Sequence, residues 1–273
     1  MGTIISKTFY YPRGEKDGEV LKTDRGDTPP LDMTKNRLIE TRILAHRADG
    51  WVALPYVWND KQSDATLKRT GDIKKLTLVS NDGAQEFPYV VPNVNQCAGC
   101  HATNATTKKL IPIGPKARHL NKPYAGEGNN QLNVWKSIGL LADLPEAINV
   151  TKAVDWTDLD ASLNSRARAY LDINCAHCHN KVGPADTSGL HFEPATETGV
   201  HLGLCKLPIA AGNGTGDRPY DIVPGDPDNS ITTYRMASTK PSEMMPELGR
   251  SLAHDEGVDL IQNWIKSLKG DCS

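Results

Sequence analysis

The stretch VPNVNQCAGCHATN, residues 91–104, contains two cysteines and a histidine in the frame C-x-x-C-H. The stretch LDINCAHCHNK, residues 171–181, contains the same frame a second time. The residues around the two copies differ, and the chain has no other repeat. We therefore expect one chemistry to be placed in two unlike structural settings. The residues that fill the two frames are Cys97, Cys100, His101, Cys175, Cys178 and His179.

C-x-x-C-H is the attachment signature of c-type haem. The two thiols add to the two vinyl groups on one edge of the porphyrin, so they must lie one helical turn apart on the same side. The adjacent histidine then lies under the ring and supplies the proximal nitrogen to iron. The sequence therefore predicts two covalently attached haem c groups, with His101 and His179 as iron ligands.

Other chemistries use similar residues. A structural zinc site needs a fourth ligand, usually from another Cys or His pair nearby, and neither motif has such a pair at finger-like spacing. A four-thiolate site with two cysteines from each motif stays open, but it leaves both histidines unexplained. A thioredoxin-like redox pair is expected once, on a strand-to-helix turn. Two haems account for more of the residues than any of these.

The sixth ligand of the second iron is expected downstream of His179. Met245 precedes Pro246 in a loop ahead of the terminal helix, which is the order found in small c-type domains, and we predict that it ligates the iron. Met244 is the fallback. Met236, in the segment ITTYRM, is assigned to core packing. A thioether ligand raises the reduction potential relative to a second imidazole.

For the first iron, no methionine lies between Cys97 and the proposed linker. His119, in IPIGPKARHLNKP, is the only other histidine of that stretch and is the predicted sixth ligand, against the alternative of a surface histidine in a basic loop. His46, on an expected strand, is a weaker candidate. A third alternative is an iron with no sixth protein ligand, which is open to small molecules.

The chain has 273 residues and a formal net charge of -2, which gives no global electrostatic case for binding nucleic acid or an anionic membrane. No apolar run of 18 or more residues is present, so no transmembrane segment is expected. The opening MGTIISKTFYYPRGEK has no apolar stretch with a cleavage site, so we expect a chain from which any export signal or lipid anchor has been removed.

With four cysteines used by the motifs, Cys205 and Cys272 are left, and we predict that they form a disulfide, against two unrelated thiols. Such a bond requires an oxidising compartment and contributes roughly 4 kcal/mol in the chain-entropy model. Three arginines are candidates to pair with haem propionates, although a solvated surface position is the default for each. They are Arg218, Arg235 and Arg250.

The first ninety residues favour β-structure. The run 37–46 alternates in polarity and is followed by Asp49-Gly50 and a second run at 51–58, which predicts a hairpin. Residues 75–91 repeat the pattern around Asn81-Asp82-Gly83. Helices are predicted over 130–141, 160–174 and 254–270, the last with an apolar stripe. With a linker at 145–160, these elements predict an α+β chain. Its two parts are a β-rich antiparallel haem domain at 1–154 and a mainly α haem domain at 155–273.

The second half resembles the haem domains of class I bacterial cytochromes c. The segments that carry the likeness are YLDINCAHCHN, GPADTSGL, DIVPGDPDNSITTYRM, MMPELGR and LIQNWI. The whole chain is similar to a family of bacterial dihaem c-type cytochromes of poorly defined role, through ETRILAHRADGWVALPYVWNDKQSDATL, YVVPNVNQCAGCH and IGPKARHLNKPY. This resemblance implies covalent haem at both motifs and electron transfer, and it implies no particular substrate.

More loosely, the first half is similar to the β-sheet cytochromes of the cytochrome c′-beta kind, in which a mostly antiparallel sheet precedes a late C-x-x-C-H. Those proteins keep one haem face open to small ligands such as nitric oxide. This chain departs from them by continuing past the motif and carrying His119 there.

The expected function is electron relay between other redox proteins, in the periplasm or on the outer surface of a bacterium, because haem of this kind is attached outside the cytoplasm. No acid–base or nucleophile constellation lies beside the motifs, which favours a carrier over an enzyme. The alternatives are a haem enzyme or gas-binding protein, peroxidase-like or a small-ligand oxidase, that uses an open first haem, and a self-assembled polymeric electron conduit.

Overall fold

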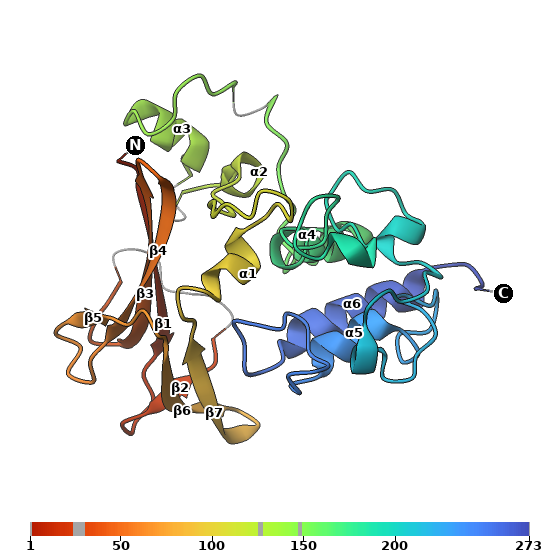
Figure 1. Cartoon of the computed structure of the whole chain (residues 1–273), viewed down its shortest axis with the longest axis horizontal. Helices are drawn as coiled ribbons and strands as arrows, with labels where there is room; N and C mark the ends of the chain where they lie inside the picture. The colour runs from red at the N-terminus through yellow and green to blue at the C-terminus, as the bar shows by residue number, and fades with distance from the viewer. Residues whose placement is uncertain (1, 24–30, 125–127, 147–148, 273) are drawn as a thin grey trace.

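The computed structural model describes residues 2–23, 31–124, 128–146 and 149–272. Strands occupy the chain up to residue 91, and helices follow from residue 97 onward (Figure 1). The mixed α+β class expected from the sequence is therefore confirmed. The division into two domains at residue 155 stays a prediction, and residues 147 and 148 of the expected linker lie outside the described residues.

The strands form two sheets. The first has the order β1-β3-β4-β5 and is antiparallel throughout. The second has the order β2-β6-β7, in which β6 and β7 are antiparallel but β2 runs parallel to β6. The second sheet is thus mixed, and β2 pairs with a strand that follows β3, β4 and β5 in the chain. The bounds are β1 Ile4–Pro12, β2 Glu19–Leu21, β3 Asn36–Arg47, β4 Gly50–Trp58, β5 Ala65–Leu67, β6 Asp72–Ser80 and β7 Gly83–Val91.

Both predicted hairpins form. Arg47 pairs with Gly50 across a two-residue loop, and Ser80 pairs with Gly83 in the same way. Gly50 and Gly83 have φ angles of 120° and 125°, which residues with a side chain rarely adopt. Gly50 and Gly83 are therefore the first residues of β4 and β7, and each follows directly after the two-residue loop.

Glu40 on β3 joins the two sheets, although the alternating sequence pattern gives no sign of it. Its side chain is fully buried, accepts two hydrogen bonds from Arg42 and accepts a third from the Tyr89 hydroxyl on β7 at 2.7 Å. Burial and the adjacent Glu40 carboxylate raise the pKa of Tyr89, so the tyrosine stays a donor. Next to Glu40, Ile39 packs against Val20, Leu76 and Phe87 of the second sheet.

The helices are shorter than the sequence patterns predict. The helix expected at 130–141 ends at Ser137, where Gly139 has a φ of 76°, and the helix expected at 160–174 begins after Ser162, which caps it by accepting from the Ser165 amide. The bounds are α1 Cys97–His101, α2 Ala117–Leu120, α3 Gln131–Ser137, α4 Leu163–Asn174, η2 Asp186–Ser188, η3 Val200–Leu202, η4 Gly212–Thr215, α5 Ile231–Ala237 and α6 Asp255–Ser267.

The main helical core lies between α4 and α6. Gly257 brings the two helices together, since a Cβ at this position would lie 2.2 Å from the Tyr170 hydroxyl. Tyr170 in turn stacks on His254 and hydrogen-bonds its Nδ1 at 2.9 Å. The core residues are Ala167, Tyr170, Leu171, Ala176, Leu190, Phe192, Leu202, Ile222, Leu260, Ile261, Trp264 and Ile265.

The α-rich part packs directly on the β-rich part. Leu252, from the loop before α6, packs against the core of the second sheet with Phe87 and Leu76. Lys22 and Glu256 form an ion pair at 2.6 Å, and the Ser251 hydroxyl donates to the Pro88 carbonyl. None of the helices in the described parts of the chain has the length and apolar character to cross a membrane.

Candidate functional site

The first motif forms the single-turn helix α1. Asn93 starts the turn, because its side-chain oxygen accepts from the amides of Asn95 and Gln96. Cys97 is buried and Cys100 is partly exposed one turn later. His101 Nδ1 lies 3.0 Å from the Ile111 carbonyl. This hydrogen bond fixes the proton on Nδ1 and directs Nε2 away as a metal-binding nitrogen.

The second motif follows directly after the end of α4. Backbone hydrogen bonds from Cys178 and His179 to the Cys175 carbonyl hold the segment in a turn. His179 is buried, contacts the Phe192 ring edge-on, and has Nδ1 3.2 Å from the Ser188 hydroxyl. Burial lowers the pKa of His179 to about 4. At neutral pH this imidazole is uncharged and keeps a lone pair, as a ligand to iron requires.

A cavity of about 440 Å³ lies over the second motif. Cys175, Cys178 and His179 line it, and so does Met245 from the loop before α6. The structure thus brings together the predicted proximal histidine and the predicted distal methionine. Met244 is buried outside this lining, whereas Met236 both lines the cavity and packs against the helical core. The apolar lining includes Leu171, Leu190, Phe192, Ile231 and Val258.

Two of the three candidate arginines also line this cavity, namely Arg235 and Arg250. Arg250 donates to three backbone carbonyls, and its Nε is buried without a hydrogen-bond partner among the described residues. A buried, unused donor is costly unless an acceptor reaches it. Arg218 is positioned differently, over the Tyr234 ring at 4.1 Å and donating to the Asp228 carbonyl. Thiols, imidazole, thioether and a free guanidinium donor in an apolar cavity are a donor set that fits c-type haem.

The two motifs lie next to each other. Cys178 Sγ of the second motif lies 3.9 Å from the Gly99 carbonyl of the first motif. Hydrogen bonds from Cys178 and His177 lower the pKa of Cys100 to about 4, and the same contact raises the pKa of Cys178. Nothing in the spacing of the motifs predicts this contact, because it depends on how the two halves pack.

Comparison of the chain with protein-family models, with curated proteins and with solved structures finds no match.

His119, the predicted sixth ligand of the first iron, lies in α2 and faces α4. Its Nε2 is 3.0 Å from Asp172 Oδ2, and Arg118 forms two hydrogen bonds of 2.7 and 2.5 Å to the same carboxylate. Asp172 is buried three residues before Cys175. Ligation of iron by His119 Nε2 therefore requires that the nitrogen leave Asp172. His46 stacks on Trp51 with ring centroids 4.9 Å apart, as expected for a sheet residue.

Within the described parts of the chain, no three His, Cys, Asp or Glu side chains lie close enough to hold a metal ion. The four-thiolate zinc site that the sequence left open is thus not formed in this structure.

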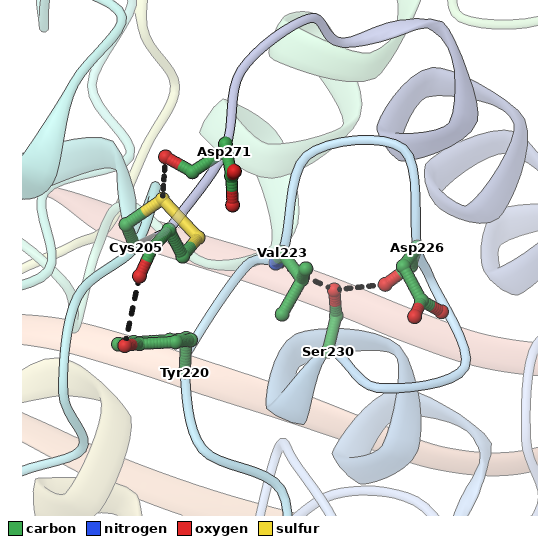
Figure 2. The surroundings of a disulfide bond; sticks show 7 residues. Cys205, Tyr220, Val223, Asp226, Ser230 and Asp271 are labelled. Atoms are coloured by element: carbon green, nitrogen blue, oxygen red, sulfur yellow. Dashed lines mark hydrogen bonds between the residues drawn. A yellow bond between two sulfur atoms is a disulfide. The ribbon is translucent and has the colours of Figure 1, made fainter.

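Cys205 and Cys272 form the predicted disulfide, with their Cα atoms 5.1 Å apart (Figure 2). The bond ties the end of the chain to the loop after η3. Tyr220 supports it by donating its hydroxyl to the Cys272 carbonyl at 3.1 Å, and the neighbouring turn is held by Ser230, which bridges Val223 and Asp226.

Proposed function

We propose that this protein is a dihaem c-type cytochrome that relays electrons between other redox proteins outside the bacterial cytoplasm. It carries two covalently attached haem c groups, one in a β-rich domain at 1–154 and one in a class I-like domain at 155–273. The proposal rests on the recurrence of C-x-x-C-H and on one observation above all, the cavity that His179 and Met245 line together with both thiols of the second motif.

The first motif supports the proposal through the hydrogen bond of His101. In both motifs Nδ1 of the histidine has a hydrogen-bond partner, Ile111 in one and Ser188 in the other. Partners of this kind orient a metal-ligating imidazole and increase its basicity. In both motifs the histidine is therefore held through Nδ1, which leaves Nε2 as the nitrogen that could bind iron.

Haem iron supplies a one-electron couple when it is bound, and the chain sets the conditions under which that couple works. Ser188 and Ile111 orient the imidazoles. Leu190 and Phe192 exclude water from the cavity, and Arg250 offers a buried N–H donor to an anionic group. The contact between the motifs keeps the two attachment sites adjacent, as a relay requires.

The disulfide supports the location. Stable disulfides form in oxidising compartments and are rare in the cytosol, and Cys205–Cys272 is such a bond. This agrees with attachment of haem outside the cytoplasm.

The test is a count of covalent haems in the protein matured by a bacterial cytochrome c assembly system. We expect the intact mass to exceed that of the amino acids by two haems and the denatured band to stain for haem. The pair Cys97→Ala and Cys100→Ala should lose one haem, and Cys175→Ala with Cys178→Ala should lose the other. A colourless parent protein at the mass of the polypeptide would overturn the proposal.

A second function is favoured by the position of His119. Because Asp172 holds its Nε2, the structure favours a first iron that is free to bind a small ligand such as carbon monoxide or nitric oxide. Absorption spectra of the reduced protein with carbon monoxide separate the two functions. A relay with two six-coordinate irons gives no change, whereas an open site gives a carbon monoxide adduct that His119→Ala leaves unaltered.

A further inference from the structure

Asp221 and Lys206 form a buried ion pair at the wall of the cavity over the second motif. The Lys206 Nζ and Asp221 Oδ2 atoms are 3.4 Å apart, and the exposed fractions of the two residues are 7% and 6%. Asp221 lines the cavity together with His179. Neither side chain is a candidate iron ligand. A buried ion pair adds little stability by itself, because desolvation of both charges offsets their attraction.

The surrounding fold fixes the position of this pair. The Asp221 amide donates to the Lys206 carbonyl at 2.8 Å, and the Asp221 carbonyl accepts from the amide and the hydroxyl of Thr232 at 3.0 and 2.9 Å. Lys206 Nζ also donates to the Leu207 carbonyl at 3.0 Å. A Cβ at Gly189 would lie 3.2 Å from Lys206 Cε, so the lysine side chain has little room to move. The carboxyl of Asp221 is therefore held at the cavity wall by the packed chain.

Two opposed effects act on the Asp221 carboxyl. Burial disfavours its charged form, whereas the cations Lys206, from the loop after η3, and Arg235, from α5, favour that form. Burial is the larger effect, so the pKa of Asp221 is raised. A carboxyl whose charged and neutral forms are balanced in this way responds to a change of charge nearby by gaining or losing a proton.

Electron transfer supplies such a change of charge. An electron that arrives at iron in this cavity adds one negative charge beside the Asp221 carboxyl. In an apolar interior that excludes water, charges interact much more strongly than they do in water. The added electron therefore disfavours the carboxylate and favours its protonated form. Because coupling between two sites is reciprocal, protonation of Asp221 favours the reduced iron by the same factor.

We propose that Asp221 takes up a proton from solvent when the second site is reduced and releases it when the site is oxidised. An O–H bond forms at a carboxyl oxygen as the redox partner supplies the electron, and both proton and electron leave on oxidation. Lys206 keeps its proton throughout, so the charge of the pair changes from zero to +1 and offsets the electron. This inference rests on the proposed function and adds to it that the second site couples electron transfer to a proton.

Potentiometric titration of the matured protein and of Asp221→Asn over a series of pH values tests the inference. At neutral pH the variant should have the higher potential at the second haem, because no carboxylate lies beside the iron. As the pH falls, the potential of the parent protein should rise until it meets that of the variant. Where one proton accompanies the electron, the equilibrium constant for reduction changes up to tenfold per pH unit, which is about 59 mV for a one-electron couple. Haem propionates titrate in both proteins and cancel in the difference.

Asp228→Asn, an exposed carboxylate in the loop before α5, is the matched control and should keep the pH dependence of the parent protein. Asp221→Asn leaves the Lys206 ammonium unpaired, so a second measurement uses the parent protein itself. Its infrared difference spectrum on reduction should show a new protonated-carboxyl band, which Asp228→Asn retains.

Two results would overturn the inference alone in a protein that carries both haems by mass. One is a difference in potential between the parent protein and Asp221→Asn that is absent or does not change with pH. The other is a parent spectrum without the carboxyl band. A protein without haem at the second motif overturns the proposed function and this inference with it.

Discussion

At the scale of single residues, two adjacent methionines lie differently relative to the cavity at the second motif. Met245 lines the cavity together with His179, whereas Met244 is buried outside it. The backbone amide of Met245 donates to the Arg235 carbonyl at 2.9 Å, which anchors the loop that presents the thioether. We therefore propose that Met245 ligates the second iron and that Met244 serves only in packing.

Met245→Ala in the matured protein is expected to remove the thioether ligand, lower the reduction potential of the second haem and open that iron to carbon monoxide, because thioether ligation favours the reduced state. Met244→Ala is the matched control. It should leave the potential and spectrum unchanged while lowering the free energy of unfolding by about 2–5 kcal/mol, as core truncation does. Potentiometric titration and urea unfolding measure the two effects. Equal potentials in the parent protein and Met245→Ala would contradict the assignment.

At the scale of elements, α2 is fastened to α4 by one buried carboxylate. Arg118 and His119 of α2 both hydrogen-bond to Asp172 of α4, and the Lys116 ammonium lies 3.9 Å from it. Burial by itself raises the pKa of Asp172, but the hydrogen bonds from Arg118 and His119 outweigh it, so the pKa is lowered. Asp172 thus contributes to stability as a carboxylate.

Because folding lowers the pKa of Asp172, the free energy of unfolding falls in acid. The stabilisation is fully present above the unfolded-state pKa of Asp, about 3.9, and is lost as the pH falls through the lower folded-state value. Asp172→Asn should lower the free energy of unfolding at pH 7 by about 1.5–3 kcal/mol and flatten its decline in acid. Asp259→Asn, an exposed carboxylate on α6, should change neither. Urea unfolding from pH 7 to pH 3 measures this, and parallel acid profiles for parent and Asp172→Asn would refute it.

Local patterns predicted the elements that depend on local chemistry. The two Asp-Gly hairpins, the terminal helix and the Cys205–Cys272 pairing all follow from short stretches or from counting cysteines. The parallel pairing of β2 with β6, the burial of Glu40 and the contact of Cys178 with Gly99 do not, because each joins residues that are far apart in sequence. The residue type and sequence position of His119 are compatible with iron ligation. Its partner Asp172 lies 53 positions away, so local sequence patterns do not predict their contact.

At the scale of the whole molecule, the β-rich and α-rich parts are linked at several points along their interface. Leu252 packs against the core of the second sheet, Lys22 pairs with Glu256, and Arg118 hydrogen-bonds to Asp172. Apolar contact across this interface makes the stability of one part depend on the other, whereas the exposed ion pair contributes little. Packing of this kind predicts that the chain unfolds as one cooperative unit.

Amide hydrogen exchange of the matured protein under rising urea tests this cooperativity. Peptides from β3 and from α6 should converge on the same opening free energy in the parent protein, because neither part opens without the other. Leu252→Ala removes the apolar link and should let the two free energies separate, with β3 and α6 opening at different urea concentrations. Leu159→Ala, at a side chain that is 80% exposed, should leave them equal. Separate transitions already in the parent protein would mean that the two parts are independent, and that the adjacency of the two motifs is not maintained by the fold.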